Sequence, residues 1–287
     1  VERRGIYLNG TDVQVTTVDG AISLTGTGGT NSNGAGIFIE NGAQVSTTGT
    51  GAITVDGTGG AGTWSSGIHL ITGVISSTGT GTITCDGMGG SGTVECPGIW
   101  IDGAAAKIES TTGNILLTAQ TKGSAENNNG FLMFQGAVRS LGTATVTING
   151  TAGSDTTSPS FGSRGIHIGD SSLVTTLNGN LSLVGISKGT GNSPIGIEIL
   201  SSASVTSTGS GALSLTGTGG TSTSGGGVTM HTSGRISSSG TGTVTLTGTG
   251  GTGDSSQGIL MDADSTGGSV FITSASGNIS LTGTASG

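Results

Sequence analysis

Residues 196–221 read GIEILSSASVTSTGSGALSLTGTGGT, and this stretch contains the pattern that decides the fold. Ile197 and Ile199 form a first apolar group, Val205 a second, and Leu213 and Leu215 a third. Polar residues alternate with these positions, and glycine, serine and threonine fill the gaps between the groups. Short alternating segments bounded by turn-forming residues are typical of half-buried strands. The stretch therefore predicts three short strands.

The same unit recurs along the whole chain of 287 residues. A glycine followed by an apolar residue begins each copy, at Gly5, Gly36, Gly67, Gly98, Gly130, Gly165, Gly196, Gly227 and Gly258. The intervals between these glycines are 31, 31, 31, 32, 35, 31, 31 and 31 residues. A fixed period in this range indicates a solenoid or array. We therefore predict one domain over residues 1–287, built from nine repeats.

One repeat has too few apolar side chains to form a core alone, so successive repeats must stack to share one. This predicts an all-β protein, a parallel β-helix (β-solenoid) with three short strands per coil and nine coils of about 31 residues. At about 4.8 Å per rung, the rod would be about 43 Å long. The general crossover preference predicts right-handed coiling. The longest repeat contains Pro159 and Phe161, which we expect in a surface loop.

The composition also fits a flexible linker, because the chain has 61 glycines and only 8% charged residues. Disorder, however, does not preserve a constant phase of paired apolar positions. The net charge is −8, and the eight Lys and Arg residues are scattered. No basic stripe suits nucleic acid, and no apolar run approaches the ~18 residues of a membrane span. We expect no nucleic-acid partner and no direct membrane insertion.

The two cysteines allow two interpretations. Cys85 occupies an inward position of a third strand, and Cys96 lies in the connector before Gly98. Their closeness in sequence is compatible with a disulfide that closes a loop. Alternatively they are two separate thiols, with Cys85 acting as a small core residue.

Catalytic and metal-binding residues are not indicated. The three histidines, His69, His167 and His231, are spread over six coils, and the acidic residues are dispersed. Only Asp56 and Asp86 fall on adjacent rungs of one outward column, where a role in stabilising turns is the simpler interpretation. We therefore predict no catalytic residue, no metal and no cofactor. A polysaccharide-cleaving enzyme, which would need a compact cluster of carboxylates, remains a minor alternative.

One outward column of the first strands has an unusual composition. It is aromatic or apolar over its first six coils, and Phe134 lies beside it. We call this set the aromatic strip: Tyr7, Phe38, His69, Trp100, Leu132, Phe134 and His167. A contiguous exposed apolar surface usually marks an interaction site, so the strip predicts lateral packing between rods. It would also suit the stacking of sugar rings. The alternative is that the connectors fold over the strip and bury it.

The outward positions of the third strands are mostly serine and threonine. Their register list is Ser23, Thr54, Thr84, Thr147, Ser182, Ser214, Thr245 and Ser280. Flat threonine arrays suggest ice binding, but serine replaces threonine freely, and Asp56, Asp86 and Leu116 interrupt the array. The strand preference of threonine explains the columns adequately. Ice binding is therefore a minor alternative.

Units such as GIEI and VTSTGSGALSLTGTGGT, with their echoes after Gly36 and Gly227, resemble the Gly/Ser/Thr-rich β-strand repeats of large bacterial surface proteins. These proteins are similar in style to filamentous-haemagglutinin-like adhesins and autotransporter passenger stalks. The resemblance covers the whole chain and implies a secreted or surface-displayed stalk, adhesin or fibre. Its motif is structural, so it transfers no binding residue.

Together these observations predict a structural building block of an extracellular or cell-surface fibre, one that self-associates end to end. Joining the two ends would place ten residues between Leu281 and Gly5, against eleven between Leu24 and Gly36, so the ends are nearly in phase. Because the chain begins with Val1, we expect a segment of a longer chain or fibre. The alternative from another class is a carbohydrate-binding adhesin module that uses the aromatic strip to bind surface glycans.

Overall fold

The computed structural model describes residues 3–92, 94–123, 127–154, 162–222, 224–263 and 268–286. Every regular element in these ranges is a β-strand, and the strands form three parallel sheets of nine strands each. Within these ranges, no helix is long and apolar enough to cross a membrane. The predicted all-β solenoid with three strands per coil is confirmed. The expected loop around Pro159 and Phe161 lies outside the described residues.

The first sheet collects the strand that follows each repeat-initiating glycine. Its members in spatial order are β1 (Ile6–Asn9), β4 (Ile37–Glu40), β7 (Ile68–Ile71), β10 (Ile99–Asp102), β13 (Phe131–Phe134), β16 (Arg164–Gly169), β19 (Ile195–Ile199), β22 (Val228–His231) and β25 (Ile259–Asp262).

The second sheet collects the middle strand of each coil. Its members are β2 (Gln14–Thr17), β5 (Gln44–Thr47), β8 (Val74–Ser77), β11 (Lys107–Ser110), β14 (Ala137–Ser140), β17 (Leu173–Thr176), β20 (Ser204–Ser207), β23 (Arg235–Ser238) and β26 (Phe271–Ser274).

The third sheet collects the longest strands. Its members are β3 (Ile22–Thr27), β6 (Ile53–Thr58), β9 (Ile83–Gly89), β12 (Ile115–Thr121), β15 (Val146–Thr151), β18 (Leu181–Ile186), β21 (Leu213–Thr218), β24 (Val244–Thr249) and β27 (Ile279–Thr284).

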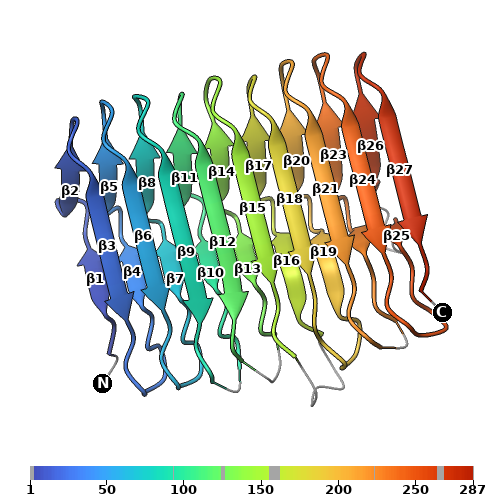
Figure 1. Ribbon diagram of the computed structural model, residues 1–287, viewed down its shortest axis with the longest axis horizontal. Helices are drawn as coiled ribbons and strands as arrows, with labels where there is room; N and C mark the ends of the chain where they lie inside the picture. The colour runs from blue at the N-terminus through green and yellow to red at the C-terminus, as the bar shows by residue number, and fades with distance from the viewer. Residues whose placement is uncertain are drawn as a thin grey trace.

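The coils wind in a right-handed sense. In Figure 1 the third sheet faces the viewer with its strands running downward, and the strands behind it run upward. The chain advances from the N-terminus at the left to the C-terminus at the right. A chain that runs downward in front and upward behind while it advances to the right forms a right-handed solenoid. The crossover preference predicts this hand.

Residues one repeat apart pair in register, which builds continuous columns of like side chains. In the first sheet Ile197 pairs with Val228, and Ile199 pairs with Met230. These side chains point inward and are fully buried. Because every coil repeats this placement, the core consists of parallel columns of apolar side chains that run along the rod axis.

The glycine that begins each repeat allows two backbones to meet at one corner of the coil. A Cβ atom added to Gly67 would lie 2.7 Å from the carbonyl oxygen of Gly57, and one added to Gly57 would lie 2.2 Å from that of Gly67. Real side chains do not tolerate such approaches. The first strand of one coil therefore packs directly against the third strand of the preceding coil, and this contact explains the period seen in the sequence.

The core columns generate a prediction about stability. Ile148→Ala, at a fully buried inward position of β15, should lower the free energy of unfolding by about 2–5 kcal/mol because it leaves a cavity. The neighbouring Thr147→Ala changes an outward side chain on the same strand and should alter it by less than about 0.5 kcal/mol. Urea denaturation of both variants measures the difference. Equal effects at the two positions would contradict the inward and outward assignment.

Candidate functional site

The aromatic strip forms a continuous column on the outer face of the first sheet. The register pairs Tyr7 with Phe38, Trp100 with His69, and Leu132 with His167. Neighbouring rings are in contact along the column. The His69 and Trp100 rings stack at a centroid distance of 4.2 Å, and the Phe38 ring meets His69 edge-on at 4.7 Å. Farther along, the Phe134 ring meets His167 edge-on at 5.2 Å.

The strip is much less exposed than we expected. Phe38, His69 and Leu132 expose only 5%, 6% and 2% of their surface, while Tyr7 exposes 46%. Trp100, Phe134 and His167 are half-buried. The expectation of a contiguous exposed surface is therefore wrong for the middle of the strip, and the alternative of covering connectors describes it better.

Part of the cover comes from a second column, which the connectors build. Asn33, Trp64, Glu95 and Asn127 each lie three residues before a repeat-initiating glycine, and each has a positive φ, between 43° and 61°. The backbone continues the stacking here, because Trp64 N donates a hydrogen bond to Val94 O at 3.0 Å. We call this column the connector wall. At the N-terminal half of the rod it closes over the strip, where the Trp64 ring stacks on Trp100 at 6.4 Å.

The side chains in the N-terminal half of the strip are packed against one another and are largely apolar. The guanidinium group of Arg4 lies over the Phe38 ring at 3.8 Å and over the Tyr7 ring at 4.2 Å. Burial, with a smaller contribution from the charge of Arg4, lowers the pKa of His69 to about 3. His69 is therefore neutral at ordinary pH and serves as a flat ring between Phe38 and Trp100.

The C-terminal half of the same face contains a cluster of ionisable side chains. The carboxylate of Glu198, on β19, accepts a hydrogen bond from Arg164 Nε at 2.8 Å. His167 Nδ1 lies 2.9 Å from Glu198 Oε2, and His231 Nε2 lies 3.1 Å from Glu198 Oε1. We call these four residues the Glu198 cluster. The Glu198 side chain is 3% exposed, and that of His231 is 30% exposed.

The surroundings of Glu198 keep it ionised. Burial by itself would raise its pKa, but the charge of Arg164 and the adjacent imidazole nitrogens of His167 and His231 hold the pKa well below its ordinary 4.5. The hydrogen bond to Glu198 in turn raises the pKa of His231 above 6.5. The stabilisation from Glu198 is therefore lost as the pH falls below 4.5, and that from His231 is lost as the pH rises through its elevated pKa.

Two cavities adjoin the Glu198 cluster and form one groove along the rod. One is about 350 Å³ and is lined on its apolar side by Leu132, Phe134 and Leu200. The other is about 280 Å³ and extends toward Leu260 and Asp262. Both cavities include Arg164, Glu198 and His231 in their lining, so they adjoin each other at the Glu198 cluster. We refer to them together as the groove.

The groove is suited to binding and not to holding a cation at Glu198. Both carboxylate oxygens of Glu198 already face cationic or imidazole partners. Among the described residues, no group of three or more His, Cys, Asp or Glu side chains is arranged to hold a metal ion. The connector wall adds Glu95 and Asn127 to the lining.

Sequence reasoning overlooked this cluster. We treated Glu198 as one of several dispersed acids and the histidines as widely spaced. The signal was nevertheless present, because His167 and Glu198 hold the same position in successive coils and pair in the register. His231 was harder to assign, because it lies on β22 two residues past Thr229, the register partner of Glu198. Its contact with Glu198 is diagonal across the sheet.

The two cysteines are not joined. Both thiols are free and buried. Cys85 points into the core of the third sheet between Val55 and Leu117, whereas Cys96 lies in the connector with its sulfur 3.4 Å from Gly62 O. Of the two interpretations, that of two separate thiols therefore describes the structure. Burial raises the pKa of Cys85 to about 12 and also raises that of Cys96.

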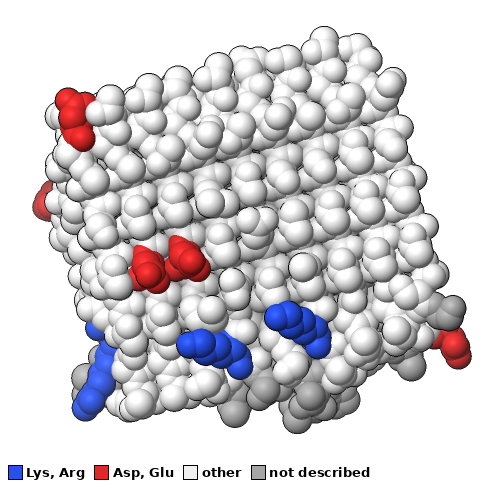
Figure 2. Space-filling view, viewed as in Figure 1, with Lys and Arg blue, Asp and Glu red and all other residues white. Residues whose placement is uncertain are grey.

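The outer face of the third sheet is flat and carries few charges, as Figure 2 shows. The register brings Asp56 and Asp86 together on adjacent rungs. Partial burial and the charge of Asp56 raise the pKa of Asp86. The serine and threonine columns are in register, but Leu116 and Ile186 expose about two fifths of their surface among them. The face is therefore not a uniform array of hydroxyl groups.

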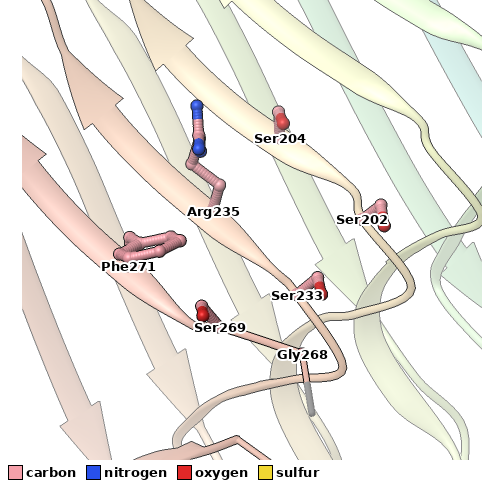
Figure 3. Close-up of a pocket in the computed structure, with 7 residues that line it drawn as sticks. All are labelled: Ser202, Ser204, Ser233, Arg235, Gly268, Ser269 and Phe271. Carbon is pink, nitrogen blue, oxygen red and sulfur yellow. The ribbon is translucent and has the colours of Figure 1, made fainter. Parts of the chain in front are cut away.

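A further depression of about 410 Å³ lies on the outer side of the second sheet (Figure 3). Ser204, Arg235 and Phe271 come from β20, β23 and β26, and the guanidinium group of Arg235 lies 5.5 Å from the centre of the Phe271 ring. Serine hydroxyls and Gly268 make up the rest of its lining. It contains no cluster of titratable groups comparable to the one around Glu198.

Comparisons with protein-family models, with curated proteins and with solved structures find no match to this chain.

The different environments of His69 and His231 lead to a prediction that NMR can test. Because its hydrogen bond to Glu198 favours the charged imidazole, His231 should titrate above pH 6.5, while His69 should remain neutral down to about pH 3. In Glu198→Gln the pKa of His231 should fall and that of His69 should not change. A pKa of His231 that is the same with and without the carboxylate would contradict the cluster.

The cysteine environments predict slow thiol chemistry. Because the reactive species is the thiolate, neither Cys85 nor Cys96 should react with iodoacetamide at pH 8 while the protein is folded, and both should react in urea. Mass spectrometry of the labelled protein measures this. Rapid labelling of Cys85 in the folded state, or an intramolecular disulfide in the purified protein, would contradict the assigned positions.

Proposed function

We propose that this chain is a structural building block of an extracellular or cell-surface fibre or stalk, lengthened by further coils of the same kind at its open ends. The observation that carries the proposal is the state of the terminal coils. In each of the three sheets, the first and last strands have one neighbour only. Their unpaired backbone edges are templates for another strand.

The last coil also leaves its core residues uncovered. Met261, Ile279 and Leu281 expose 40%, 44% and 49% of their surface. Their register partners one coil earlier are Met230, Val244 and Leu246, which are fully buried. The exposure therefore follows from the position of this coil at the end of the stack and not from the residue type. One more coil in the same register would bury all three side chains.

The first coil is open in the same way. Leu8, Val15 and Leu24 contact the core but are only partly buried. A further coil in the same register would cover these side chains, and its contact with the first coil would run head to tail along the rod. A contact of this head-to-tail type does not close on itself and generates a filament.

Different observations support the proposed extracellular location and the proposed mode of self-association. The extracellular or surface location is supported by the resemblance of the repeats to those of bacterial surface proteins. Lateral packing through the whole aromatic strip receives less support, because Phe38, His69 and Leu132 are buried. Self-association in this proposal is therefore axial.

End-to-end stacking can be tested with one inward and one outward substitution on β27. At high protein concentration the unmodified chain should form rods whose lengths are multiples of about 43 Å, the height of nine rungs. Leu281→Lys would place a charge in the junction, so it should shift the population to single rods. Ser280→Lys adds the same charge to the outward face and should leave the rods intact. Sedimentation velocity and electron microscopy measure the outcome.

Two results would contradict the proposal. One is a single rod at every concentration for the unmodified chain. The other is association that Leu281→Lys and Ser280→Lys reduce to the same extent, because that would assign the contact to general surface charge.

A further inference from the structure

The groove beside the Glu198 cluster is long and narrow, and its two sides differ in chemistry. The lining of its two adjoining cavities extends from Leu132 in the fifth coil to Leu260 in the ninth. Four steps of about 4.8 Å make this about 19 Å, which is longer than one sugar ring or one amino acid side chain. The ligand that fits this shape is an extended chain lying parallel to the rod axis.

One side of the groove offers flat apolar contacts. Leu132, Phe134 and Leu200 line it, and Phe134 is held in place by its edge-on contact with His167. Ring-shaped polyhydroxy compounds have an apolar face of C–H groups that packs against such side chains. Cavities that bind small molecules commonly combine an apolar lining with a few placed polar groups, in a volume of about 300–1,000 Å³.

The rest of the lining includes polar groups that can form further hydrogen bonds. Glu95, on the connector wall, is half-buried, and among the described residues it has no hydrogen-bond or ion-pair partner. Burial raises its pKa, as expected for a half-buried carboxyl without such a partner. Its φ of 43° belongs to the left-handed region, which is uncommon for a residue other than glycine. Asn127 stands next to it on the same wall.

The charges argue against an anionic ligand. Arg164, which lines both cavities, is committed to Glu198. Glu95 and Asp262 add negative charge to the groove, and the whole chain has a net charge of −8. A uronate, sulfate or phosphate group would therefore meet repulsion without a free cation to offset it.

The backbone argues against a peptide strand. The floor strands β13, β16, β19 and β22 are hydrogen-bonded to neighbours on both sides, so they offer no edge on which a peptide could add. Recognition in the groove must therefore come from side chains.

From these features we propose that the groove binds an uncharged oligosaccharide along the rod axis. Phe134 and the leucines pack against the C–H faces of its rings, and Glu95 and Asn127 accept and donate hydrogen bonds to its hydroxyl groups. The Glu198 cluster acts beneath the ligand as a positioning element that holds His167 and His231 in their orientations. The proposed site thus uses only the C-terminal part of the aromatic strip and not Trp100, whose ring stacks with His69 and Trp64.

The experiment uses the full chain and defined probes. Hexasaccharides of β-1,4-linked glucose, xylose, mannose and N-acetylglucosamine, the matching disaccharides, an oligogalacturonate and an extended decapeptide are titrated into the protein by calorimetry. At least one neutral hexasaccharide should bind, and its disaccharide should bind about tenfold more weakly or worse because it contacts fewer coils. The oligogalacturonate and the peptide should bind more weakly than that hexasaccharide.

Three variants locate the site. Phe134→Ala removes the apolar platform and should weaken binding of the neutral hexasaccharide by about tenfold or more, which corresponds to about 1.4 kcal/mol. Glu95→Gln preserves shape and burial while removing the carboxylate, and it should weaken binding at least about threefold without affecting the fold. Trp64→Ala removes an aromatic side chain from the same wall outside the groove, and it should leave the affinity unchanged.

Failure of all neutral hexasaccharides to bind the folded protein would overturn the proposal. So would tighter binding of the oligogalacturonate or the peptide, or an affinity that Phe134→Ala and Glu95→Gln leave intact. An equal loss in Trp64→Ala and Phe134→Ala would also overturn it, because the binding surface would then not be the groove.

Discussion

The rest of the structure depends on the backbone contact between two glycines at one corner of each coil. At this corner the third strand ends and the next first strand begins, and no Cβ atom fits between them, as Gly57 and Gly67 show. The contact fixes where each repeat turns, so the three sheets keep the same register from coil to coil. The core columns, the connector wall and the groove all follow from that register. The 61 glycines of this chain therefore help to specify its fold and do not make it flexible.

The Glu198 cluster is the main departure from this repetitive plan. Other carboxylates of the first sheet, such as Glu40 and Asp102, are half-buried, but Glu198 is almost completely buried. Burying a charge is costly unless it is paired, and Arg164, His167 and His231 provide that pairing. A rod does not need such a cluster to stack its coils. Its position beneath a groove is what distinguishes this part of the molecule from a plain spacer.

Most of the fold could be predicted from the sequence because the period and the alternation report directly on register. The phase alone placed Cys85 inward and put Asp56 next to Asp86 on the third sheet. The connectors could not be predicted in the same way, because Gly, Ser and Thr give no periodic apolar signal. The backbone at Trp64 and Glu95 is left-handed, which turns the connector toward the aromatic strip. The local composition does not predict this conformation. The diagonal contact between His231 and Glu198 likewise depends on three-dimensional register.

The measurement that tests the central claim most directly is the distance between two outward positions of the third sheet that are six rungs apart. Thr54 and Thr245 are connected by consecutive register pairs through Thr84, Leu116, Thr147, Ser182 and Ser214. Spin labels at these two threonines, measured by double electron–electron resonance, should give one narrow distribution. It should be centred near a backbone separation of about 29 Å, six steps of about 4.8 Å. A broad distribution, or a centre that departs from this value by more than the length of the labels, would contradict continuous coil stacking in register.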